Sequence, residues 1–148
     1  SYPILSVEDP LAEDDVQAFR EFTRRYRGRC QVIGDDLLVT NADRVRDTAD
    51  AVTAVLIKPN QAGTITETRA AVDAARDQGL ATIVSARSGE SEDVTIAHLA
   101  IGWNAGQLKV GSFSRSERMA KWNECLRIEE ELGPNAPFAA REVLGIER

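Results

Sequence analysis

The sequence predicts an α/β fold built from five strand–helix units around a parallel sheet. Short apolar runs alternate along the chain with longer amphipathic stretches, an alternation typical of parallel strands joined by crossover helices. The connections are short, and no low-complexity segment or linker separates the units. With 148 residues, of which 43% are apolar, the chain is long enough to bury a hydrophobic core, so we expect a single domain.

Five short apolar runs are the predicted strands. None of the runs reaches the length of an ordinary helix. The runs cover residues 4–7, 31–34, 54–57, 81–85 and 107–110.

The first helix is predicted from the spacing of its apolar residues. Val16, Phe19, Phe22 and Tyr26 recur at helical spacing, and Gly28 ends the pattern. A second helix is expected from about residue 42 onward.

Polar caps and glycines mark the ends of the later helices. Asn41 can cap the second helix, and Thr64 with Glu67 forms a capping box that opens a third helix, which ends at Gly79. The third helix is expected to bury Ile65, Val72 and Ala75.

The remaining helices are predicted in the same way. The fourth covers about residues 93–103, and a second capping box, Ser114 with Glu117, opens a long fifth helix that stops at Gly133. We expect residues 134–148 to form a tail with one short helix, because two prolines lie in this stretch.

The net charge, the lengths of the apolar runs and the two cysteines indicate which partners and which cellular location to expect. The formal net charge of −6 argues against nucleic acid, which requires a basic face. No apolar run approaches the roughly 18 residues of a membrane span, and no signal peptide is visible, so we expect no membrane partner and a cytoplasmic location. Cys30 and Cys125 lack the spacing of a disulfide framework or a zinc site, which predicts two reduced, buried thiols.

Charged residues lie just after the first four predicted strands and inside the very short fifth one. These residues are Glu8, Asp35, Lys58, Arg87 and Lys109, separated by 27, 23, 29 and 22 positions, or about one strand–helix unit each. Because parallel strands end at the same edge of a sheet, we expect the five side chains to share one rim. That rim is where ligands bind in α/β folds.

Each charge taken alone also has a simpler structural explanation. Glu8 or Asp9 can favour the start of the next helix, Asp35–Asp36 can form a turn, the two lysines can be surface residues, and Arg87 can be an ion-pair partner. Five such coincidences at five successive strand ends instead favour a shared site. Two carboxylates and three cations there can hold a divalent cation beside an anionic substrate.

Five stretches of the sequence resemble one known family. They read SVEDPLAEDD, GDDLLVTN, LIKPNQAGTITET, SARSGESEDVTIA and GQLKVGSFSRSERMAKWNECLRIEEELG, and they are similar to the carboxyl-terminal barrel domain of enolase, the glycolytic 2-phosphoglycerate dehydratase. The resemblance runs from Pro3 to Gly133. It implies a partial (β/α)8 TIM-type barrel with about five of the eight units, over residues 1–133, followed by a tail over residues 134–148.

The resemblance also implies a role for each residue of the rim. Glu8 and Asp35 would hold Mg²⁺, and Lys58 would be the base that removes the C2 proton of 2-phosphoglycerate on the way to phosphoenolpyruvate. Lys109 would bind the substrate carboxylate and support the enolate, while Arg87 and Ser88 would bind the phosphate. The pairing of a lysine base with magnesium is the known arrangement of the enolase superfamily.

Several departures from the family pattern bear on activity. The pattern Ser-His-Arg-Ser reads Ser85-Ala86-Arg87-Ser88 here, and the chain's only histidine, His98, lies on the next predicted helix. Pro59 stands where the family commonly has valine. The absent units would carry a third metal carboxylate, the general acid and a mobile loop.

Two functions therefore stay open at this stage. One is an enolase segment that is inactive or weakly active alone; the other is a non-catalytic half-barrel that serves as a metal- or phosphate-binding or assembly module. A half-barrel leaves open edges. We therefore expect a homo-oligomer, a complementing amino-terminal enolase part or a wrapped tail to cover them.

Overall fold

The computed structural model describes residues 2–139 and 142–146 and confirms the predicted α/β fold. Its single sheet has the strand order β1-β2-β3-β4-β5, and every neighbouring pair is parallel. The strands are β1 (Ser6–Glu8), β2 (Gln31–Gly34), β3 (Ala54–Ile57), β4 (Ala81–Ser85) and β5 (Gly106–Lys109).

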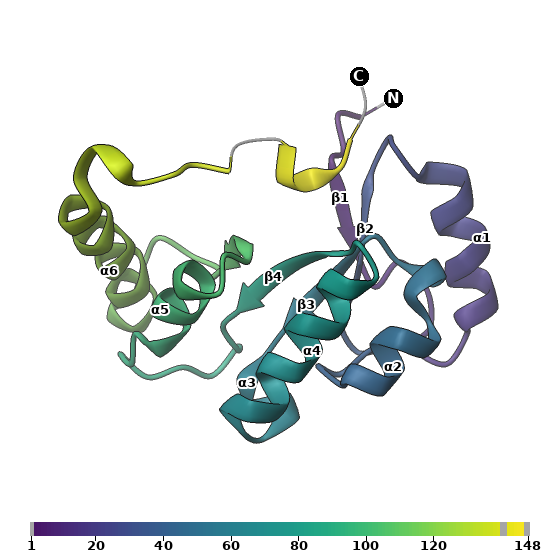
Figure 1. Ribbon diagram of the computed structural model, residues 1–148, viewed down its shortest axis with the longest axis horizontal. Helices are drawn as coiled ribbons and strands as arrows, with labels where there is room; N and C mark the ends of the chain where they lie inside the picture. Colours follow the sequence, from purple (N-terminus) through teal and green to yellow (C-terminus); the bar gives the residue numbers. More distant parts are fainter. Residues whose placement is uncertain (1, 140–141, 147–148) are drawn as a thin grey trace.

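Six α-helices in the described part of the chain connect or follow the strands. They are α1 (Val16–Tyr26), α2 (Ala42–Asp47), α3 (Pro59–Ala62), α4 (Ile65–Asp77), α5 (Thr95–Gly102) and α6 (Ser116–Leu132). Short 3₁₀ turns lie at η1 (Ala49–Ala51), η2 (Gly133–Asn135) and η3 (Glu142–Leu144). The helices follow one another around the outer side of the sheet (Figure 1).

The sheet curls into a partial barrel with two different faces. Its outer face packs on the helices and forms the main core, in which Phe19, Val32, Val55 and Val72 are fully buried. The inner face carries only a small cluster, made of Ile33, Ala54, Leu56 and Ile83. An ion pair between Lys109 on β5 and Glu8 on β1 shows that the carboxyl ends of the two edge strands curve toward each other.

The chain's local signals explain most helix ends. Asn41 accepts hydrogen bonds from the N–H groups of Asp43 and Arg44, and the Thr64 hydroxyl accepts one from Glu67 N–H. The Glu67 carboxylate accepts a hydrogen bond from the Thr64 hydroxyl, so this capping box is only half formed. Gly133 ends α6 with a φ of 57°, a backbone conformation that glycine adopts easily.

Three details of the sequence prediction are wrong. Ile65, the first residue of α4, is 49% exposed, whereas Val72 and Ala75 are buried as predicted. Ser114 does not cap α6: the helix begins one residue after Arg115, whose φ is 70°, and the Ser114 hydroxyl pairs with that of Ser112. The helix α3 was not predicted.

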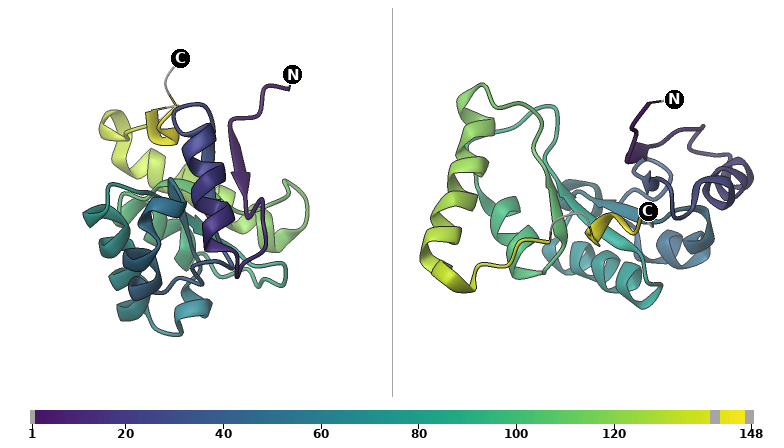
Figure 2. Two further views of the ribbon diagram at one scale, coloured as in Figure 1. Left: turned by 90° about the vertical axis from the view of Figure 1, so that its right-hand side faces the viewer. Right: turned by 90° about the horizontal axis from the view of Figure 1, so that it is seen from above.

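The carboxyl-terminal tail returns from α6 to the amino-terminal end of the sheet (Figures 1 and 2). Gln31 donates a hydrogen bond to the carbonyl of Val143 at 3.4 Å. A Cβ atom on Gly106 would lie 2.5 Å from Val143 Cγ2, so only glycine fits beside the tail at the start of β5. The predicted boundary at residue 133 stays a prediction, and residues 1, 140–141 and 147–148 lie outside the described residues.

The two cysteines were predicted to be buried, reduced thiols, and the structure places both at intermediate burial. Cys30 and Cys125 are free thiols, each partly buried, and burial raises the pKa of both. Within residues 2–139 and 142–146, no helix combines the length and the apolar character needed to cross a membrane.

Candidate functional site

The predicted rim lies at the carboxyl ends of the strands, around a cavity of about 550 Å³. Asp35, Lys58, Arg87, Ser88 and Lys109 all line this cavity. Glu8 lines a neighbouring hollow on the inner face, which also contacts Lys109. A larger cavity of about 850 Å³ at the opposite end, beneath the tail, contains none of the predicted site residues.

Lys58 and Asp35 form a buried ion pair at the centre of the site. The distance from Lys58 Nζ to Asp35 Oδ2 is 2.5 Å, and the side chains are only 11% and 8% exposed. Each residue directly follows a strand, β3 for Lys58 and β2 for Asp35. The pairing of adjacent parallel strands therefore brings the two charges together.

A ring of hydrogen bonds holds this pair in place. The Lys58 N–H donates to the Thr40 hydroxyl, which donates to Gln61 Oε1 at 2.7 Å. The Gln61 amide in turn donates to Asp35 Oδ1 at 3.1 Å. Thr40 is 1% exposed and has a φ of 53°, an uncommon backbone conformation for a β-branched residue, which places its hydroxyl in the ring.

Glu8 and Lys109 form the second ion pair of the site. Lys109 Nζ lies 2.5 Å from Glu8 Oε2, and the side chains are 46% and 30% exposed. The Glu8–Lys109 pair is therefore more exposed to solvent than the Lys58–Asp35 pair. Together the two pairs place two carboxylates and two ammonium groups on the rim, as the strand-end pattern predicts.

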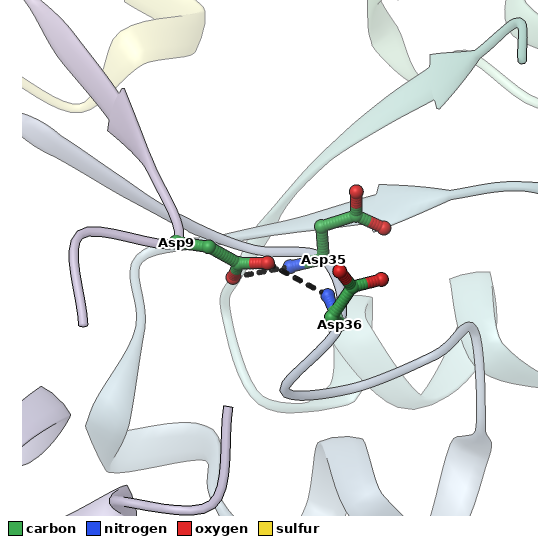
Figure 3. A group of neighbouring side chains, drawn as sticks. All are labelled: Asp9, Asp35 and Asp36. Atoms are coloured by element: carbon green, nitrogen blue, oxygen red, sulfur yellow. Dashed lines mark hydrogen bonds between the residues drawn. The ribbon is translucent and has the colours of Figure 1, made fainter. Parts of the chain in front are cut away.

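Three aspartates also cluster near the rim. Carboxylate oxygens of Asp9, Asp35 and Asp36 lie within 4.8 Å of one another. Both oxygens of Asp9 accept hydrogen bonds from backbone N–H groups, those of Asp35 and Asp36, at 2.9 and 2.8 Å (Figure 3). Asp9 therefore fixes the loop after β2, and this structural role accounts for its position.

The loop after β4 carries the predicted phosphate-binding residues. The Arg87 guanidinium donates to Asn60 Oδ1 at 2.9 Å, and Arg87 N–H donates to Glu90 Oε1 at 2.7 Å. Ser88 is exposed. Arg87 and Ser88 thus form a more exposed part of the cavity lining than the buried Lys58–Asp35 pair.

Comparison with known proteins decides the family. The family model described as "Enolase, C-terminal TIM barrel domain" matches residues 1–146. The chain belongs to the enolase family. A curated enolase from Anaplasma marginale (strain St. Maries) is 52% identical over 137 residues, which is 91% of this chain and 32% of that relative. The chain therefore spans about a third of the length of this enolase.

Ala86 lies within the site, at the position where the sequence resemblance implies a histidine. Its side chain lines the cavity directly before Arg87, and its backbone N–H donates to the Lys109 carbonyl at 2.9 Å. Only a methyl group therefore stands at this point of the cavity wall. His98 lies on α5, as predicted, and contacts Glu124 on α6 at 2.9 Å, so it is a helix-surface residue.

Two residues of this enolase segment contact the site and were not predicted from the sequence. Arg118 lines the cavity from α6, and Lys121 contacts the loop after β4. Both are buried, whereas Leu126 and Leu132 on the same helix are 61% and 41% exposed. This inverted pattern, with cations inside and leucines outside, is visible only in the structure, so the sequence offers no signal that could have identified them.

Proposed function

We propose that the chain is the carboxyl-terminal catalytic segment of an enolase, which dehydrates 2-phosphoglycerate to phosphoenolpyruvate in glycolysis. The observation that carries the proposal is the single cavity lined by Asp35, Lys58, Arg87, Ser88 and Lys109 in a chain of this family. The predicted cytoplasmic location and the absence of nucleic-acid and membrane partners accompany this role.

The proposed roles follow the charges around the cavity. As the neutral amine, Lys58 takes up the C2 proton on Nζ and becomes an ammonium, which the neighbouring Asp35 carboxylate holds in place. Lys109 binds the substrate carboxylate, and Arg87 and Ser88 bind the phosphate from the more exposed part of the cavity lining. A substrate that carries two anionic groups would thus lie between cations from three different strands.

The residues present fit a magnesium ion in chemical type. Mg²⁺ prefers oxygen ligands and is usually held by one or two carboxylates together with substrate oxygens and water, and Glu8 and Asp35 supply two such carboxylates. When bound, the ion would offset the negative charge that develops on the substrate carboxylate. Glu8 Oε2 and Asp35 Oδ2 each contact a lysine, so the lysines and the ion would share these carboxylates.

The isolated chain is expected to have little or no activity. It covers about a third of the length of the matched enolase, and the absent part would carry the general acid and a third metal carboxylate. Loss of a general acid alone costs about 10²–10⁴ in rate. The proposed partner that would supply these groups is therefore the amino-terminal part of an enolase, whereas a second copy of the chain would cover only the open sheet edges.

An assay of phosphoenolpyruvate formation tests the proposal. Its ultraviolet absorbance is followed with 2-phosphoglycerate and Mg²⁺, for the chain alone and for the chain mixed with the amino-terminal part of a homologous enolase. We expect turnover in the mixture and its loss, by about 10²-fold or more, in Lys58→Arg. Arginine keeps the charge beside Asp35 but cannot act as a base.

The matched control is Arg46→Lys, on α2, where the side chain contacts only the exposed Asp43. Its turnover should equal that of the unchanged chain. If the mixture never turns over, the catalytic proposal fails.

A second candidate function rests on Ala86. A half-barrel that keeps the metal and phosphate residues but has a methyl group at the histidine position fits a non-catalytic binding or assembly module. Turnover by the chain without any partner would exclude this candidate.

A further inference from the structure

Two buried cations on α6, one helical turn apart, contact the loop between β4 and α5. Arg118 is 5% exposed and Lys121 is fully buried. Burying a charge is costly unless other groups compensate for the lost water. Their burial in a helix that exposes leucines therefore needs a reason, and their contacts supply one.

Arg118 is held almost entirely by carbonyl groups of the site loops. Its Nη1 donates to the carbonyls of Arg87 and Val110 at 2.7 and 3.0 Å, and its Nη2 donates to that of Ser88 at 2.8 Å. Among the residues that the structure describes, no carboxylate lies within 4.0 Å of this guanidinium. Arg118 thus joins the ends of β4 and β5, and its positive charge adds to those of Arg87 and Lys109 around the cavity.

These contacts set the direction of two backbone N–H groups. In a trans peptide, the carbonyl and the following N–H point in opposite directions. Because the Arg87 and Ser88 carbonyls point to Arg118, the N–H groups of Ser88 and Gly89 point away from α6. Neither N–H has an acceptor in the described part of the chain, and both residues are exposed, so the two donors are available to an anion.

Lys121 orders the same loop through a carboxylate. Its Nζ lies 2.9 Å from Glu90 Oε2 and donates to the Ser91 carbonyl at 2.6 Å. The other oxygen of Glu90 accepts the Arg87 N–H at 2.7 Å. A continuous chain of contacts therefore runs from α6 through Glu90 to the backbone of Arg87.

We propose that Arg118 and Lys121 are positioning residues for phosphate binding. They fix the loop over residues 86–91 so that the Arg87 side chain, the Ser88 hydroxyl and the N–H groups of Ser88 and Gly89 converge on one anionic group. This inference rests on the proposed function in that the anion is the phosphate of the substrate.

Nuclear magnetic resonance titration of the 148-residue chain tests the inference. The amide signals of Ser88 and Gly89 are followed as phosphoenolpyruvate, and separately inorganic phosphate, is added to the unchanged chain, Arg118→Met, Lys121→Met and Arg118→Lys. Hydrogen exchange at the Arg87 amide reports the order of the loop, and exchange in β3 reports the fold. Arg127→Met is the matched control, because Arg127 lies on the same helix but is exposed and contacts only Glu124.

We expect the two methionine variants to bind phosphoenolpyruvate about 10- to 100-fold more weakly, with faster exchange at Arg87 and unchanged exchange in β3. Arg127→Met should bind like the unchanged chain. Arg118→Lys keeps a buried cation but reaches fewer carbonyls, so its affinity for phosphoenolpyruvate should be intermediate. This variant tests the role of Arg118 if Arg118→Met does not fold.

Two different results would overturn the inference. If the unchanged chain binds and the folded variants bind equally well, the positioning role is wrong while the proposed function stands. If neither probe shifts Ser88 or Gly89 in the unchanged chain, the phosphate role of the loop is wrong and the proposed function fails with it.

Discussion

Lys58 and Asp35 show how two neighbouring strands bring together two buried charges, each of which would be costly to bury without the other. Both are buried, and the strands that precede them are hydrogen-bonded neighbours. Within a parallel sheet the position after one strand necessarily lies beside the position after the next. The pair was therefore predictable from sequence spacing, although the hydrogen-bonded ring through Thr40 and Gln61 was not, because it depends on the positive φ of Thr40.

Removing one partner of this pair should destabilise the fold more than removing both. Lys58→Met leaves the Asp35 carboxylate buried without its cation and should cost about 3 kcal/mol. The double variant Lys58→Met/Asp35→Asn should recover part of that loss, since no buried charge remains. Urea unfolding of the single and double variants measures the difference, and strictly additive losses would contradict the prediction.

Ala86 is the residue at which a single substitution should raise activity. Its methyl group lines the cavity beside Arg87, so Ala86→His would restore the family's side chain at the site. In the complemented mixture described above, we expect turnover to rise about tenfold or more. Ala86→Gln is the control of similar size without an imidazole; equal effects of histidine and glutamine would show that bulk alone is responsible.

The roles of Arg118 and Lys121 could not be predicted from the sequence. In the sequence they look like ordinary surface charges of a long helix, and the strand-end pattern does not include helices. Their partners are mostly backbone carbonyls, which carry no sequence signal. Only the folded loop shows what these two cations contact.

At the scale of elements, strands were predicted better than helix ends. The bounds of β2, β3 and β4 agree with the apolar runs, because these strands are covered by neighbours on both edges and are almost wholly buried. The two edge strands, β1 and β5, are shifted by one or two residues, since only one neighbour defines each of them. Four-residue α3 is too short for apolar periodicity to indicate it.

The start of α5 depends on a carboxylate rather than on a formal cap. Asp93 accepts a hydrogen bond from Thr95 N–H at 2.9 Å, and this backbone hydrogen bond, followed by the Thr95 side chain, lowers the pKa of Asp93 from its ordinary 3.8. Because the pKa of Asp93 is lower in the folded chain than in the unfolded chain, its carboxylate contributes its full stabilisation at pH values above the unfolded pKa. This stabilisation is lost as the pH falls from about 4 through the lowered value.

Asp93→Ala should therefore lower the free energy of unfolding by about 1 kcal/mol at neutral pH. The difference from the unchanged chain should shrink as the pH falls below about 4. Asp93→Asn keeps an oxygen acceptor without a titrating charge. The difference in free energy of unfolding between Asp93→Asn and Asp93→Ala should therefore not change with pH in this range. Urea unfolding at several pH values checks both, and a constant difference for Asp93→Ala would contradict the assignment.

At the scale of the whole molecule, the open edges of the half-barrel should lead to association. In the described part of the chain, strands β1 and β5 each have one unpaired edge, and the inner face carries a small apolar cluster of four residues, Ile33, Ala54, Leu56 and Ile83. We expect a mass above the 16.2 kDa of one chain in light scattering. A monomeric mass together with a cooperative thermal transition would contradict this prediction.

The tail limits how any partner could complete the barrel. Residues 142–146 lie across the amino-terminal end of the sheet, with Val143 against Gly106 and hydrogen-bonded to Gln31. That entrance is already occupied by the chain's own backbone. New strands would therefore have to approach sideways, between the free edges of β5 and β1. A complementing piece with a long extension at the amino-terminal end of its strands would collide with the tail before it could pair.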